Sequence, residues 1–192
     1  MGRRTSCIMV AGVCGLLVGP RGAWGESQQS AAPSPKAVEA IKLLESPDPF
    51  QRQLGFLRLE ALREPSTVET IKKYVDSRDE EMGAYSLRAL AAIGGVDAIP
   101  TLLEKLKTDR QPMVRRAALL GLEPFQAADL RILPAFIKAL RDQSVEVRIS
   151  AVDVVSRIDD PRAREAIFTR NQRERDRDVR RVLAMAMKRI GK

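Results

Sequence analysis

The stretch QPMVRRAALLGL, from Gln111 to Leu122, shares its pattern with SVEVRISAVDVV, from Ser144 to Val155. In both stretches a Val-Arg pair is followed, four positions after the Val, by an Ala, and the second pair stands 33 positions after the first. Repetition at a period of this length is typical of a chain built from stacked copies of one small unit. The repeated Arg therefore has two possible roles, in chemistry or in holding copies together.

The same register extends along most of the chain. Apolar residues open five segments at spacings of 32, 32, 33 and 32, and the first segment can also be aligned one residue later. Apolar or small residues recur four positions further on, and in the last four segments apolar residues also recur eight positions further on, which places them on one helix face. The opening residues are Phe50, Met82, Val114, Val147 and Val179.

Shorter apolar segments such as AIPTLLEKL and ILPAFIKAL alternate with these long ones, and no segment shows the period-two pattern of a strand. A helix pair of this size buries its apolar face only by stacking on neighbours. We therefore predict an all-α solenoid of about five helix pairs over residues 37–192. The expected helices cover 37–45, 49–63, 66–76, 80–93, 98–107, 112–122, 129–141, 144–157, 161–169 and 177–190.

The segments VRRAALLGL, VRISAVDVV and VRRVLAMAM, with AIPTLLEKL and LPAFIKALRD between them, resemble HEAT repeats. They are most similar to the short variety known from phycobilisome lyases, and the resemblance covers about Ala37 to Ile190. It implies a right-handed α-α superhelix that serves as a binding scaffold. The first two units depart from the pattern, with Gln51 and Gly83 where Arg is expected, and the fourth short helix departs with Arg164-Glu165.

Each recurring Arg follows an acidic residue by six positions. The resemblance implies that these acids and arginines pair between neighbouring units, as an inter-repeat ladder of charge-assisted hydrogen bonds. The alternative is a row of guanidinium groups that holds an anionic ligand. The favoured ladder comprises the acids Asp109, Asp142 and Glu174 and the arginines Arg115, Arg148 and Arg180.

Catalytic chemistry has few candidates in this sequence. The chain contains no His, which removes the commonest general base and zinc ligand, and its two Cys residues lie within the first fourteen positions. The acid pairs Glu80-Glu81 and Asp159-Asp160 stand at expected helix starts, where carboxylates act as caps. We therefore predict no catalytic residues, no metal site and no cofactor.

The first residues have the features of a secretory signal. A basic start, MGRR, precedes the apolar run from Cys7 to Gly19, and small residues at Ala23 and Gly25 predict cleavage before Glu26. An uncleaved anchor is the alternative. We predict a signal peptide over 1–25, a disordered polar leader over 26–36, and an exported protein, periplasmic or secreted.

Charge is concentrated at the carboxyl end, where residues 169–192 hold nine basic and three acidic residues in a chain of net charge +8. This end could be a solvated cap of the solenoid, could dock an acidic protein or an anionic membrane surface, or could bind nucleic acid, which export makes unlikely. An uncovered apolar stripe on the last helix would favour self-association.

The favoured function is a non-catalytic scaffold that binds an acidic protein partner through the inner face of the solenoid, built from the short helices. The alternative, implied by the resemblance, is an accessory subunit of an enzyme that handles a tetrapyrrole. The predicted partner-binding residues are Lys72, Lys105, Lys138, Arg164, Arg180 and Arg181.

Overall fold

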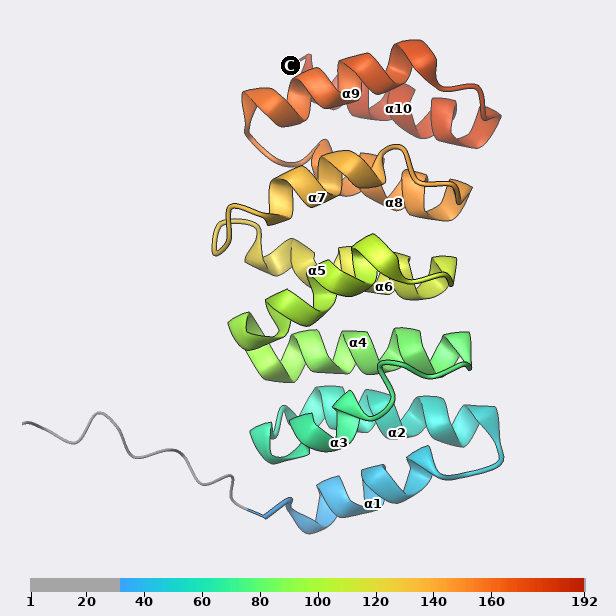
Figure 1. Cartoon of the computed structure of the whole chain (residues 1–192), viewed down its shortest axis with the longest axis vertical. Helices are drawn as coiled ribbons and strands as arrows, with labels where there is room; N and C mark the ends of the chain where they lie inside the picture. The colour runs from blue at the N-terminus through green and yellow to red at the C-terminus, as the bar shows by residue number, and fades with distance from the viewer. Residues whose placement is uncertain (1–31, 192) are drawn as a thin grey trace, which may run out of the picture.

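The computed structural model describes residues 32–191, which form a single stack of helices with no strand in this range (Figure 1). The predicted all-α solenoid is confirmed. The observed helices are α1 (Pro35–Leu44), α2 (Pro49–Leu62), α3 (Val68–Lys72), α4 (Glu80–Gly94), α5 (Ile99–Thr108), α6 (Pro112–Leu122), α7 (Ile132–Ala139), α8 (Val145–Val155), α9 (Pro161–Arg173) and α10 (Arg177–Ile190). Short 3₁₀ turns, Pro65–Thr67, Gly95–Ala98 and Glu123–Phe125, precede α3, α5 and α7 respectively.

The helices form two rows, with α2, α4, α6, α8 and α10 in the long-helix row and the others in the short-helix row. The turns within each pair, from α5 to α6, α7 to α8 and α9 to α10, lie along one edge of the stack (Figure 1). The long-helix row is the more closely packed along the stack. The predicted binding face, built from the short helices, corresponds to the row of α3, α5, α7 and α9.

The repeated apolar stripe forms the core that the sequence predicts. Met82, Val114, Val147 and Val179 are all buried, as are the small or apolar residues four positions after them. Phe50 is the exception, because its side chain is 79% exposed while Phe56 fills the core of that unit. The assignment of Phe50 as a buried opening residue is therefore wrong.

The junction between α4 and α6 depends on small residues. A Cβ atom at Gly83 would stand 3.0 Å from Cγ2 of Val114, and one at Gly121 would stand 3.1 Å from Cβ of Ala91. At both positions a larger residue would press on the facing helix, so glycine permits the two helices to approach closely.

The predicted helix stop at Gly94-Gly95 is confirmed, because Gly95 ends α4 with a φ of 56°. This break divides the stretch 80–108, which is apolar and long enough to be considered as a membrane span, into α4 and α5. Leu87 from α4 and Leu102 from α5 lie fully buried in the core. The apolar character of this stretch is accordingly accounted for by packing inside the stack.

The first helix begins at Pro35, two residues earlier than the predicted start at Ala37. Ser34 caps this helix by accepting a hydrogen bond from the N–H of Ala37, and its own N–H and hydroxyl donate to the Glu64 carboxylate. The hydrogen bonds from Ser34 hold the pKa of Glu64 below its usual value. The predicted signal peptide and the first part of the leader lie outside the described residues.

Candidate partner-binding surface

Arg115 joins the third unit to the fourth. Its guanidinium donates through Nε and Nη2 to both carboxylate oxygens of Asp142, at 2.8 and 2.6 Å, while Nη1 donates to the carbonyl oxygens of Asp109 and Arg110. The side chains of Arg115 and Asp142 are only 11% and 12% exposed. Hydrogen bonding to Asp142 raises the pKa of Arg115 despite this burial. All these donors serve structure, so Arg115 is not available for an anionic ligand.

Arg148 repeats this arrangement one unit later. Its Nη1 donates to the carbonyl oxygens of Asp142 and Gln143, and its Nε lies 3.1 Å from a Glu174 carboxylate oxygen. Burial of Glu174, whose side chain is 3% exposed, would by itself raise its pKa. Hydrogen bonds from the Asp176 N–H and the Arg170 guanidinium outweigh that effect and lower the pKa to about 2. Glu174 is thus an ionised carboxylate held inside the fourth junction.

The first unit also contains a ladder residue, at a position that the repeat alignment did not identify. Arg52 donates to the carbonyl oxygens of Ser46 and Pro47 and to the Asp79 carboxylate, which is the pattern of Arg115 and Arg148. This geometry selects the alignment of the first unit one residue later than Phe50. In this alignment Arg52, and not Gln51, stands at the position where the repeat pattern expects Arg. The departure predicted at Gln51 therefore disappears.

The second unit has no ladder arginine, because Gly83 occupies that position. The carboxylate of Asp109 is instead reached by Lys105, whose Nζ lies 3.2 Å from it and 2.5 Å from Asp76. Burial of the Lys105 ammonium opposes its charge, but the hydrogen bonds to Asp76 and Asp109 prevail and raise its pKa. Lys105, predicted to bind a partner, is therefore engaged inside the fold.

Arg180 on α10 differs from the other predicted ladder arginines. Its side chain is exposed and forms no ion pair within residues 32–191, so its predicted place in the ladder is wrong, while the ladder acid Glu174 is held by Arg148 and Arg170. Arg181 is also exposed and lies 3.9 Å from Asp178 on its own helix. Both residues lie on the last helix of the stack, and the structure does not bring them near Lys72 or Lys105.

The other predicted partner-binding residues do not form one surface. Lys72 pairs with Glu69 in its own helix, and Arg164 pairs with Asp159 in the preceding turn. Of Lys72, Lys138 and Arg164, all exposed, Lys138 alone has no ion pair within residues 32–191. Of the four residues predicted on the short helices, Lys138 lines the groove described below, whereas Lys72, Lys105 and Arg164 do not.

A row of exposed basic residues was missed by the repeat analysis. A basic residue stands one or two positions before each ladder carboxylate, and none of these four side chains forms an ion pair within 32–191. The sequence feature that could have identified them is the recurrence of Lys or Arg one or two positions before each ladder carboxylate. We name this row the basic turn edge, and it comprises Arg78, Lys107, Arg141 and Arg173.

The carboxylates beside this edge do not balance its charge. Asp79, Asp109 and Asp142 are bonded to Arg52, Lys105 and Arg115 respectively, and Glu174 is bonded in the same way. The Arg52–Asp79 and Arg115–Asp142 pairs are neutral in sum, whereas Lys105 is shared by Asp76 and Asp109, and Glu174 by Arg148 and Arg170. None of these carboxylates pairs with the basic turn edge, whose cations therefore face solvent without an ion pair within residues 32–191. Such an arrangement produces a positive field along the stack that an acidic partner would sense.

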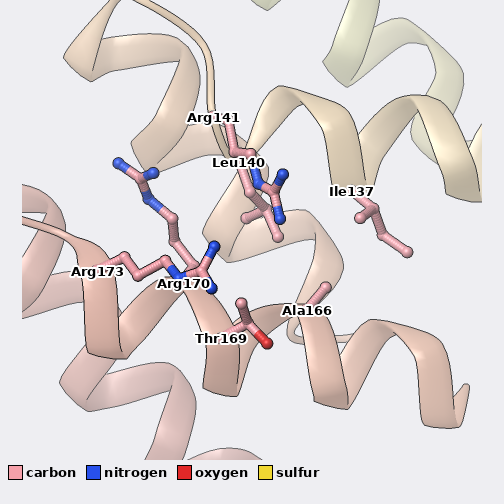
Figure 2. A pocket seen from close by; sticks show the side chains of 7 residues that line it. All are labelled: Ile137, Leu140, Arg141, Ala166, Thr169, Arg170 and Arg173. Carbon is pink, nitrogen blue, oxygen red and sulfur yellow. The ribbon is translucent and has the colours of Figure 1, made fainter.

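Two hollows lie on the short-helix side and meet at this edge. A groove of about 1160 Å³ separates α5 from α7, and a small hollow of about 30 Å³ separates α7 from α9. Arg141 lines both of them. Figure 2 shows Arg141, from the turn after α7, and Arg170 and Arg173, from α9, extending toward the same end of the smaller hollow.

The described residues offer no constellation for catalysis. Glu80 accepts a hydrogen bond from the Met113 N–H, while Asp160 caps α9 through the Arg162 N–H and lies beside Asp159. No group of three or more potential metal ligands is present between residues 32 and 191. The acid pairs singled out in the sequence therefore act at helix starts.

Comparison with known proteins agrees with this architecture. The model of the family described as HEAT repeats matches residues 37–123 and 99–188. The complex of CpcE and CpcF of phycocyanin lyase from Nostoc is similar in structure, with a TM-score of 0.66 and 22% sequence identity, over 79% of this chain and 97% of that chain. No curated protein sequence matches the chain.

Proposed function

Since this chain belongs to the HEAT-repeat family, we propose that it is a non-catalytic scaffold that binds an acidic protein partner along the basic turn edge. One observation carries the proposal. Lys107, Arg141 and Arg173 recur unit by unit as exposed cations, whereas the neighbouring carboxylates are already engaged by the ladder. A regularly spaced row of this kind favours a long acidic surface over a single small anion.

The experiment compares two sets of charge reversals. The edge variant combines Lys107→Glu, Arg141→Glu and Arg173→Glu, and the control combines Lys36→Glu, Lys42→Glu and Arg58→Glu on α1 and α2, which are exposed and unpaired within 32–191. Both variants change the net charge by the same amount. We expect the edge variant to lose its retention on immobilised poly-glutamate and its cross-linked partner in the source cell, while the control keeps both. Equal retention of the two variants would refute the proposal.

We also propose that the protein works outside the cytoplasm, on the strength of the sequence pattern over residues 1–25. Mass spectrometry of the purified protein is expected to find Glu26 at the amino terminus, in an envelope or secreted fraction. A full-length cytoplasmic protein would contradict export and would reopen nucleic-acid binding by the basic carboxyl end. An intact amino terminus in the membrane fraction would instead support the uncleaved anchor.

A second candidate is a subunit of a lyase-like complex that handles a tetrapyrrole. The similarity to the CpcE and CpcF complex supports it at the level of the fold alone. Residues 26–192 contain neither Cys nor His, the side chains with which a lone subunit would most readily perform such chemistry. Absorbance titration with a bilin discriminates the two functions, because the scaffold is expected to leave the bilin spectrum unchanged.

A further inference from the structure

The groove between α5 and α7 has an apolar floor. Leu106 and Ala139 are buried beneath it, and Leu103 and Ala135 are half-buried along its walls. The two helices face each other here with small residues on the α7 side, which leaves space that larger side chains would fill. Apolar surface of this kind gains free energy when another apolar side chain covers it.

The rim of the groove is basic. Lys107, Arg110, Lys138 and Arg141 are exposed and form no ion pair within the described residues. Of the three carboxylates that line the groove, Asp109 and Asp142 belong to the ladder, and only that of Glu104 is without an ion pair in the same range. The groove therefore combines an apolar floor with a surplus of cations above it.

Size and charge together restrict the occupant. The groove volume of about 1160 Å³ exceeds the roughly 300–1,000 Å³ of a small-molecule pocket, and it is bounded by helices of ten and eight residues. The chain's own segment before residue 32 is basic, because it holds Arg3, Arg4 and Arg21 against Glu26 alone. A small ligand would not fill the groove, and the basic segment before residue 32 would be repelled by the basic rim.

We propose that this groove binds a short acidic peptide segment of the partner, whose apolar side chains enter between α5 and α7 while its carboxylates face the rim. The inference deepens the proposed function and depends on it, since the same cations belong to the basic turn edge. The edge supplies attraction along the whole stack, and the groove supplies recognition of sequence. Acidic residues interspersed with apolar residues at helical spacing are the expected feature of the bound segment.

The test uses two fluorescent peptides of equal length and charge. One repeats Glu with Leu at helical spacing, and the other has Ser in place of every Leu. Fluorescence anisotropy with the full chain is expected to show binding at least about tenfold tighter for the Leu peptide, because its apolar side chains become buried. Ala135→Trp is expected to abolish that preference by filling the groove, and Pro134→Trp, at an exposed lining position, is a second variant that leaves the core untouched.

The outcomes separate the groove from the edge. Equal affinity for both peptides, lost in Arg173→Glu but unchanged in both Trp variants, would overturn the groove and leave the basic turn edge standing. Failure of both peptides to bind would overturn the groove and the proposed function together. A Leu peptide that bridges two copies of the chain, detected by sedimentation, would also overturn the groove, because it would place the apolar contact between copies.

Discussion

Two junctions in this molecule join neighbouring units by different means. Between α6 and α8, Arg115 clamps the Asp142 carboxylate through two short hydrogen bonds and also holds the turn before its own helix. Between α4 and α6, glycine stands at the arginine position, and the helices instead approach closely at Gly83 and Gly121. Lys105 forms the ion pair with Asp109 that the missing arginine would have formed.

The comparison shows that a repeat can exchange a polar strut for close packing without losing its register. A Cβ atom at Gly83 would meet Val114 at 3.0 Å, so a long side chain and a close approach exclude each other at this place. The carboxylate of Asp109 still needs a cation once it is half-buried, since an unpaired charge there is costly. Lys105 supplies that cation from a different helix and is thereby withdrawn from partner binding.

Replacement of Arg115 tests the polar junction and is expected to have the largest effect. Arg115→Ala leaves the Asp142 carboxylate largely buried without its guanidinium and removes the hydrogen bonds to the Asp109 and Arg110 carbonyls. We expect the free energy of unfolding to fall by about 3–5 kcal/mol, measured by urea denaturation. A loss below about 1 kcal/mol would mean that packing alone holds this junction.

The Glu174 carboxylate makes the fourth junction sensitive to acid. Because its pKa is lowered from 4.5 to about 2, its ionised form stabilises the fold above the unfolded-state pKa, and this contribution is lost as pH falls through that interval. Glu174→Gln is expected to lower stability at pH 7 by about 2 kcal/mol. The difference from wild type should shrink between pH 5 and pH 2, and a constant difference would contradict the assignment.

Restoring the repeat arginine tests the packed junction. Gly83→Arg is expected to destabilise the chain by about 1–3 kcal/mol, since its Cβ presses on Val114 across the closely spaced helices. Gly83→Ala should cost less, because the helical preference of Ala over Gly, about 1 kcal/mol, offsets the same contact. Thermal unfolding of both variants provides the measurement. Stabilisation by Gly83→Arg would show that the two junctions are interchangeable.

The first ladder residue should matter least. Arg52 pairs with Asp79 at 3.2 Å, and Asp79 is far more exposed than Asp142. Water and salt screen such a pair, so Arg52→Ala is expected to cost under about 1 kcal/mol. Urea denaturation alongside Arg115→Ala provides the direct comparison. An equal loss in the two variants would show that the carbonyl contacts, which both arginines make, dominate over the ion pair.

The repeat pattern predicted much of the helical arrangement, and it erred where local chemistry departs from the pattern. Phe50 is apolar and correctly spaced, yet it is exposed, because the first unit is displaced by one residue and Arg52 occupies the ladder position. A spacing counted along the chain cannot detect such a displacement, because the displaced unit opens with the polar Gln51 and the search for apolar residues selects Phe50 instead. α3 ends earlier than the predicted helix 66–76, and α9 ends later than the predicted helix 161–169. Helix ends depend on individual capping residues, which the spacing of apolar residues does not report.

The candidate surface was harder to predict than the fold. Lys105 and Lys138 appear equivalent in the sequence, but the first is held by two carboxylates and the second is exposed at the groove. Their difference follows from Gly83, which lies on another helix and alters the partners available to Asp109. Pairing between distant side chains is a property of the packed stack, and no local pattern reports it.

The sequence by itself determined the period, the positions that face the core and the excess of positive charge, because helical periodicity and composition are properties of the chain. Only the tertiary structure decided which charges are neutralised and which remain exposed. The ladder consumes one arginine and one carboxylate at each junction where it is complete, and the cation beside it is left over. The exposed cations beside the ladder carboxylates, Lys107, Arg141 and Arg173, line the two hollows between the short helices only once the helices are stacked.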